Sequence, residues 1–169
     1  MKIKSSNLVF GGISTALIIL LLYIGSIIPT NKIFFMAFSI AVGSIPYIKG
    51  GVKSGVVVYL ASSILSFFLV PNKLYIGIYI IFGIYPFIKL ISEKYSIAIE
   101  YIIKYICFNI LTLTAYFVYS SFVYLGPLFE NTYLIIGFIV GIQILFYIFD
   151  FAFTKCIMFF EDRILKRIK

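Results

Sequence analysis

Long uncharged apolar stretches alternate with short polar or lysine-bearing segments along the whole chain. A helix needs about 20 residues to cross a hydrocarbon core of ~30 Å, and most of these stretches approach or exceed that length. Six are present: residues 8–28, 33–48, 54–70, 74–88, 105–129 and 132–149. The pattern predicts an all-helical, polytopic integral membrane protein with six spans. We expect residues 1–169 to form a single transmembrane domain.

A repeated sequence phrase closes the second and fourth stretches. Residues 43–49 read GSIPYIK and residues 83–89 read GIYPFIK, each after an apolar segment that opens with a lysine. Because proline lacks an amide hydrogen and clashes with the preceding turn, we expect Pro46 and Pro86 to kink or end their helices. We interpret the repeat as a duplicated membrane hairpin. The alternative is that the two phrases arose independently, because helices that leave a bilayer commonly end with such residues.

The composition excludes a soluble domain and leaves little material for enzyme chemistry. Apolar residues make up 63% of the chain and charged residues 12%, and the mean hydropathy is +1.14. With two cysteines and no histidine, the usual metal ligands and histidine-activated nucleophiles are scarce. We therefore expect no catalytic residues, no metal and no cofactor.

Lysine and arginine are distributed unequally between the two sides that six spans create. Only Lys32 and Lys73 fall on one side. The other twelve basic residues are Lys2, Lys4, Lys49, Lys53, Lys89, Lys94, Lys104, Lys155, Arg163, Lys166, Arg167 and Lys169. The positive-inside rule therefore predicts a plasma-membrane protein with both termini in the cytoplasm and three short turns outside, at residues 29–32, 71–73 and 127–131. The net charge of +8 then reflects topology and predicts no nucleic-acid binding.

One acidic residue lies inside the last stretch. At a rise of 1.5 Å per residue, Asp150 is about 27 Å from Thr132, close to the predicted cytoplasmic interface. We expect Asp150 to pair with Lys104 or Lys155 rather than to relay protons. Cys107 and Cys156 are also predicted near that interface, where a reducing compartment disfavours a disulfide.

Gly12 and Ala16 form a small-x-x-x-small face on the first stretch, and such faces let two helices approach closely in lipid. Together with six spans, basic charge and cytoplasmic termini, this face resembles the S components of energy-coupling factor (ECF) vitamin transporters. In that family the motif reads Ala-x-x-x-Ala and docks on the membrane-embedded T component. The resemblance covers the whole chain. It implies capture of a vitamin or similar micronutrient, with import powered by two ATPase subunits.

Polar side chains near the predicted outer turns are the candidate substrate contacts. They are Asn31, Lys32, Asn72, Lys73, Tyr75, Tyr124, Glu130 and Asn131. The two lysines would suit a carboxylate or a phosphate. The alternative is that these residues form turns and an interfacial tyrosine belt, which a bilayer favours regardless of function.

Two further resemblances keep other functions open. The chain is similar to the rod-shape morphogenesis protein MreD, which would make it a scaffold for cell-envelope or shape machinery rather than a transporter. Few outer polar groups and short outer turns favour that alternative. The chain also resembles YybS-type membrane proteins, which share spans bearing small residues and a second helix that ends at proline.

Residues 156–169 are predicted to continue the last span as a basic amphipathic tail. Ile157, Phe160, Ile164 and Ile168 would share its apolar side. Basic side chains near anionic lipid gain on the order of 1 kcal/mol each, so we expect this tail to lie on the inner membrane surface.

Overall fold

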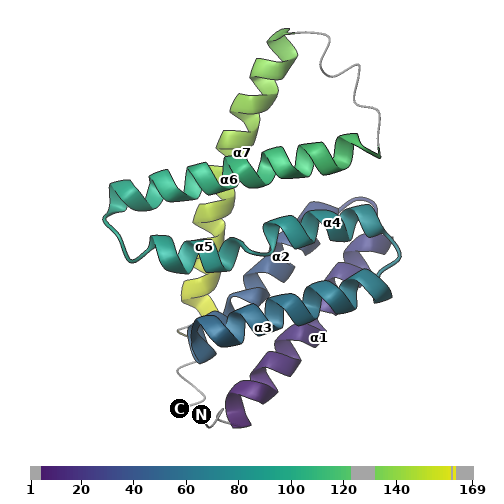
Figure 1. Ribbon diagram of the computed structural model, residues 1–169, viewed down its shortest axis with the longest axis vertical. Helices are drawn as coiled ribbons and strands as arrows, with labels where there is room; N and C mark the ends of the chain where they lie inside the picture. Colours follow the sequence, from purple (N-terminus) through teal and green to yellow (C-terminus); the bar gives the residue numbers. More distant parts are fainter. Residues whose placement is uncertain (1–4, 123–131, 161, 163–169) are drawn as a thin grey trace.

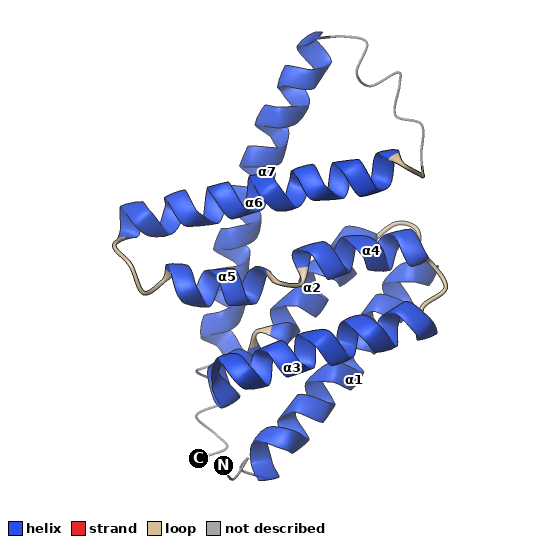
Figure 2. Ribbon diagram, viewed as in Figure 1, coloured by secondary structure: helices blue, strands red, loops and turns tan. Residues whose placement is uncertain are grey.

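The computed structural model describes residues 5–122, 132–160 and 162, and these residues contain helices and turns but no strand (Figures 1 and 2). The helices are α1 (Ser5–Ile27), α2 (Lys32–Gly43), α3 (Ile45–Leu69), α4 (Lys73–Phe82), α5 (Tyr85–Ser92), α6 (Ile97–Ser120) and α7 (Thr132–Phe159). The predicted all-helical class is confirmed for this part of the chain.

Five helical stretches within the described residues are long and apolar enough to cross a membrane. They are Leu8–Ile27, Lys32–Leu69, Lys73–Ser92, Ile97–Ser120 and Ile136–Phe159. By length and apolar composition, these helices fit a multi-pass membrane protein.

The Lys32–Leu69 stretch is interrupted twice. It has 38 residues, which would span about 57 Å as one straight helix, nearly twice a hydrocarbon core of ~30 Å. The first interruption is at Ser44, between α2 and α3. The second is at Gly51, whose φ of 74° and ψ of −176° fall in a region that essentially only glycine adopts. Both α2 and α3 pack against α1.

The two copies of the repeated phrase have the same local structure. Pro46 and Pro86 each occupy the first turn of a new helix, α3 and α5, where a missing amide hydrogen costs no helical hydrogen bond. Both prolines therefore interrupt their stretches as predicted. The residues that follow them, Tyr47 and Phe87, have ring centroids 6.4 Å apart, so the two interruptions lie in contact.

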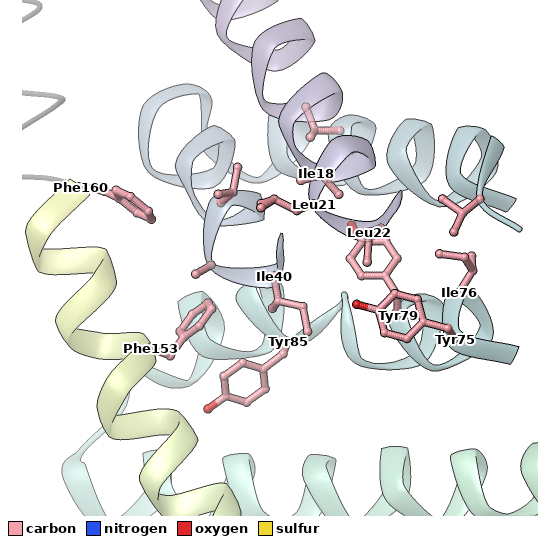
Figure 3. Packing of buried hydrophobic residues seen from close by; sticks show 14 of the residues in the cluster. Ile18, Leu21, Leu22, Ile40, Tyr75, Ile76, Tyr79, Tyr85, Phe153 and Phe160 are labelled. Carbon is pink, nitrogen blue, oxygen red and sulfur yellow. The ribbon is translucent and has the colours of Figure 1, made fainter. Parts of the chain in front are cut away.

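The core is centred on α1, α2 and α4 and extends to α3, α5 and the second half of α7. Ile18, Leu22, Ile40 and Ile76 are buried there, and Figure 3 shows their side chains converging with those of Tyr75 and Tyr79. In contrast, α6 and the first half of α7 are mostly exposed, and α7 crosses α6 steeply before running alongside the rest of the bundle (Figure 1).

The bundle has two ends with different side chains. The turn end holds the α1–α2 and α3–α4 turns, which are joined by a 2.9 Å hydrogen bond from the Tyr75 hydroxyl to the Lys32 carbonyl. The lysine-rich end holds the α5–α6 turn and the segment around Lys49, whose ammonium lies 3.0 Å from the centre of the Phe10 ring near the start of α1.

Several helix boundaries differ from the predicted spans. The fourth stretch continues as α5 to Ser92, α6 begins at Ile97 rather than residue 105, and α7 continues to Phe159 rather than residue 149. The predictions placed these three boundaries at the charged residues Lys89, Lys104 and Asp150, but those side chains pair with one another and lie within helices. The start of the predicted tail, Cys156–Phe159, continues α7, whereas residues 123–131 and 163–169 lie outside the described residues.

Candidate functional site

Three charged side chains are buried where α5, α6 and α7 meet. Lys89 and Lys104 are each 2% exposed and Asp150 is 7% exposed. A buried charge is costly unless it is paired and hydrogen-bonded, so this site depends on its internal contacts. We call the following residues the charge cluster: Tyr85, Lys89, Glu93, Glu100, Lys104, Asp150 and Thr154.

The Asp150 carboxylate is the centre of the charge cluster. Its Oδ1 atom accepts a hydrogen bond from the Tyr85 hydroxyl at 2.5 Å and lies 3.2 Å from the Lys89 ammonium. Its Oδ2 atom accepts from the Lys104 ammonium at 3.1 Å. One carboxylate on α7 therefore holds donors from both α5 and α6.

Each buried lysine also has a glutamate partner on its own helix. The Lys89 ammonium lies 3.0 Å from a Glu93 oxygen, and the Lys104 ammonium lies 2.5 Å from a Glu100 oxygen, both at the four-residue helical spacing. Lys89 also donates to the Thr154 hydroxyl at 2.9 Å. The two ammonium groups are thus balanced by Asp150 and Glu100, while the Glu93 side chain is 45% exposed.

Aromatic side chains seal the charge cluster on one side. The Tyr85 ring centre lies 5.8, 5.5 and 5.5 Å from those of Phe146, Phe149 and Phe153 of α7. Phe146 also stacks on Phe108 of α6 at 4.1 Å. Because these rings exclude water, the ionic contacts behind them act in a low-dielectric setting and are stronger than exposed pairs.

The prediction that Asp150 pairs with Lys104 or Lys155 is confirmed for Lys104, and Lys89 is a second partner. Lys155 has no such contact, because five residues along a helix place it about 140° around the axis, whereas Thr154 shares the face of Asp150. The role of Lys89 was not predicted from the sequence, where Lys89 is counted only among the basic residues of the cytoplasmic side. Its spacing from Glu93 is the sequence signal that could have placed it in a helix.

The predicted substrate contacts that the structure describes lie at the turn end, and three of them make local hydrogen bonds. Asn72 accepts from the Tyr75 amide at 3.0 Å, which caps the start of α4. Lys73 donates to the carbonyls of Phe67 and Val70 at the end of α3. These are the contacts expected of turn residues.

The remaining predicted contacts divide into two groups. Asn31 is exposed and precedes α2 without a side-chain capping bond, and Lys32 is half-buried beside it. Tyr124, Glu130 and Asn131 lie outside the described residues. The described members are therefore brought to one end of the bundle, around the hydrogen bond that joins the two turns.

A pocket of about 400 Å³ opens at the turn end between α4 and α6. Its walls are almost wholly apolar, and Lys73 and Tyr119 supply the polar groups at its edge. Its lining residues are Phe67, Lys73, Leu74, Gly77, Ile78, Ile81, Ala115, Val118, Tyr119 and Phe122. Pockets for small molecules commonly hold roughly 300–1,000 Å³, so this turn-end pocket is large enough for one.

The Gly12 and Ala16 face is open. Both residues are exposed on α1, and a Cβ atom added at Gly12 would meet nothing within 4 Å. The rest of the described chain therefore does not use this face for its own packing.

No protein-family model, curated protein or solved structure matches the chain. Among the described residues, no group of three histidine, cysteine, aspartate or glutamate side chains is arranged to hold a metal ion. Function must therefore be inferred from the chemistry of the charge cluster and the turn-end pocket.

Proposed function

We propose that this chain is a six-span plasma-membrane protein that captures a small solute, as the S subunit of an ECF-type micronutrient transporter. Gly51 supports six spans, because a break at this position lets the Lys32–Leu69 stretch cross twice. The excess of basic residues supports a cytoplasmic lysine-rich end. The turn end and its pocket would then face outward.

The turn-end pocket is the observation that carries this proposal. Its apolar walls suit a ring or a short hydrocarbon, and the Lys73 ammonium at its edge suits a carboxylate or phosphate on the same molecule. An ammonium has three hydrogens, and the carbonyls of Phe67 and Val70 accept from it. One hydrogen remains for an anionic group on the solute.

Filling this pocket tests the proposal directly. Gly77 lines the pocket and a Cβ atom there meets nothing within 4 Å, so Gly77→Leu projects a side chain into the cavity without striking the backbone. We expect mass spectrometry to detect a bound small molecule in the purified wild-type protein and none in Gly77→Leu. Gly137→Leu, also in open surroundings but on α7, is the matched control. Retention of the same molecule by both variants would exclude this pocket as the capture site.

The open face of α1 supports docking on a T component. Purification from native membranes in mild detergent should then recover a T-type membrane subunit and two ATPases. Gly12→Leu should weaken that assembly, because leucine holds the helices apart, whereas Gly141→Leu on α7 should leave it unchanged. An assembly equally resistant to both changes would exclude the Gly12 face as the docking surface.

A membrane scaffold of cell-envelope or shape machinery is the second candidate. It is favoured by the exposed apolar surface of the first half of α7, where every residue from 136 to 141 is exposed. The same purification separates the two functions. Recovery of cell-envelope synthesis proteins, with neither ATPases nor a bound small molecule, would favour the scaffold.

A further inference from the structure

A second pocket, of about 180 Å³, lies between α6 and α7 beside the charge cluster. Tyr101 contributes one wall from α6, and Tyr147, Thr154 and Lys155 contribute the facing wall from α7. Phe151 and Met158 add apolar surface. We call it the α6–α7 pocket. It is separate from the turn-end pocket, and no residue lines both.

Lys155 gives the α6–α7 pocket a positive charge with no acidic partner among the described residues. Its ammonium lies 5.5 Å from the centre of the Phe151 ring, and the ion pairs of the charge cluster involve Lys89 and Lys104 instead. Asp150 also lines the pocket, but both of its oxygens already contact those two buried lysines. The charge that remains available to a ligand is therefore that of Lys155.

Two hydroxyl groups add hydrogen-bond donors to this charge. Tyr101 is 41% exposed and Tyr147 is 55% exposed, and neither hydroxyl bonds to another residue in the described part of the chain. The Thr154 hydroxyl is committed, since it donates to the Asp150 carbonyl and accepts from Lys89. An ammonium and two phenolic hydroxyls around an apolar floor match an anionic group that carries a hydrocarbon chain.

We propose that the α6–α7 pocket binds the phosphate of an anionic membrane lipid. Lys155 pairs with the phosphate, the hydroxyls of Tyr101 and Tyr147 donate to its oxygens, and Phe151 and Met158 contact the first carbons of the lipid. Basic pockets between membrane helices bind such headgroups, and this pocket lies on the part of α7 that runs toward the lysine-rich end. The proposal stands whether or not the chain captures a solute.

Native mass spectrometry of the full-length protein in detergent tests this site with phosphatidylglycerol as the probe. We expect Lys155→Ala to weaken phosphatidylglycerol binding about fivefold to tenfold, and Tyr147→Phe to weaken it about threefold. Lys94→Ala is the matched control, because it removes the same charge from an exposed position on the α5–α6 turn. Since Lys94, Tyr147 and Lys155 are all exposed, the three variant proteins should melt at the same temperature as the wild type.

Two comparisons identify the source of the phosphate and its location. Phosphatidylcholine should bind more weakly than phosphatidylglycerol, and inorganic phosphate at the same concentration should not displace the lipid. Displacement by inorganic phosphate would overturn a lipid site in favour of a free anion. Equal losses in Lys155→Ala and Lys94→Ala would show that lipid binding follows overall charge, and would overturn the α6–α7 pocket as its location.

Discussion

Replacing Asp150 by asparagine should destabilise this protein more than replacing any other single acidic residue in the charge cluster. The change keeps the outline of the side chain but removes the one carboxylate that contacts both Lys89 and Lys104. Both lysines are 2% exposed, so water does not solvate their ammonium groups once the carboxylate charge is removed. Two ammonium groups would then be left with Glu93 and Glu100 alone.

The expected magnitude follows from the contacts that remain. Breaking a buried ion pair by removing one partner costs about 3–5 kcal/mol. The asparagine oxygen still accepts one hydrogen bond, and each lysine keeps a glutamate four residues away, so we expect a loss near the lower limit, about 3 kcal/mol. For a chain of this size, 1 kcal/mol corresponds to about 2–4 °C in Tm. Asp150→Asn should therefore melt about 6–12 °C below the wild type.

A thiol-reactive fluorescent dye provides the assay, because the chain has no tryptophan. Cys107 and Cys156 are both unpaired and half-buried, so unfolding exposes them to the dye. Glu93→Gln is the matched control. It removes a lysine partner that is 45% exposed, and a pair of that kind contributes about 1 kcal/mol at most. If Asp150→Asn melted within about 2 °C of Glu93→Gln, the Asp150 carboxylate would not be what compensates the buried lysines.

A double-mutant cycle isolates the ionic contact from other effects of the change. Lys104→Met and Asp150→Asn should each destabilise the protein, and the combined variant should be more stable than the sum of the two losses predicts. We expect a coupling of at least about 1 kcal/mol, since the two side chains are in direct contact at 3.1 Å. Additive losses would mean that the contact contributes little to stability.

Three further predictions follow from the backbone and from the proposed topology. Gly51→Ala should cost about 1–3 kcal/mol in the same melting assay, because alanine does not tolerate φ 74° with ψ −176°; a Tm equal to that of Gly77→Ala would contradict this. Gly55→Ala should cost about 1–3 kcal/mol, because its Cβ atom would overlap a buried tyrosine ring, and an unchanged Tm would mean that the ring moves freely. On a background without native cysteines, Pro71→Cys should react with an impermeant thiol reagent in whole cells and Lys94→Cys should not; the reverse pattern would invert the topology.

Much of the architecture could be predicted from simple patterns. Long apolar stretches predict helices that are long and apolar enough to cross a membrane, and five such helices are present among the described residues. Pro46 and Pro86 interrupt those stretches because the proline ring lacks an amide hydrogen and clashes with the preceding turn. The break at Gly51 was not predicted. Glycine is compatible with helix, turn or extended backbone, and the sequence alone does not distinguish a positive φ from a helical one.

The charge cluster was only partly predictable because its compensation is non-local. Lys89 and Lys104 each read as the limit of a span when the sequence is scanned for apolar runs, and Glu100 reads as part of the loop between them. Lys104 lies inside α6 because Asp150, 46 residues later in the chain, returns to it across the helix crossing. Pairing over such a distance depends on tertiary packing, whereas the Lys89–Glu93 spacing is local and was visible in the sequence.

The order in which the cluster residues occur along the chain has a consequence for biosynthesis. During translation, α5 and α6 leave the ribosome before α7, so Lys89 and Lys104 are out of the ribosome before Asp150 can reach them. Each lysine already has a glutamate on the adjacent turn, and such a pair is cheaper to insert into a bilayer than a lone ammonium. The two glutamates would thus act first as temporary counterions during insertion. Asp150 is synthesised last, and its contacts with both lysines link the Lys89–Glu93 and Lys104–Glu100 pairs into one ionic network that connects α5, α6 and α7.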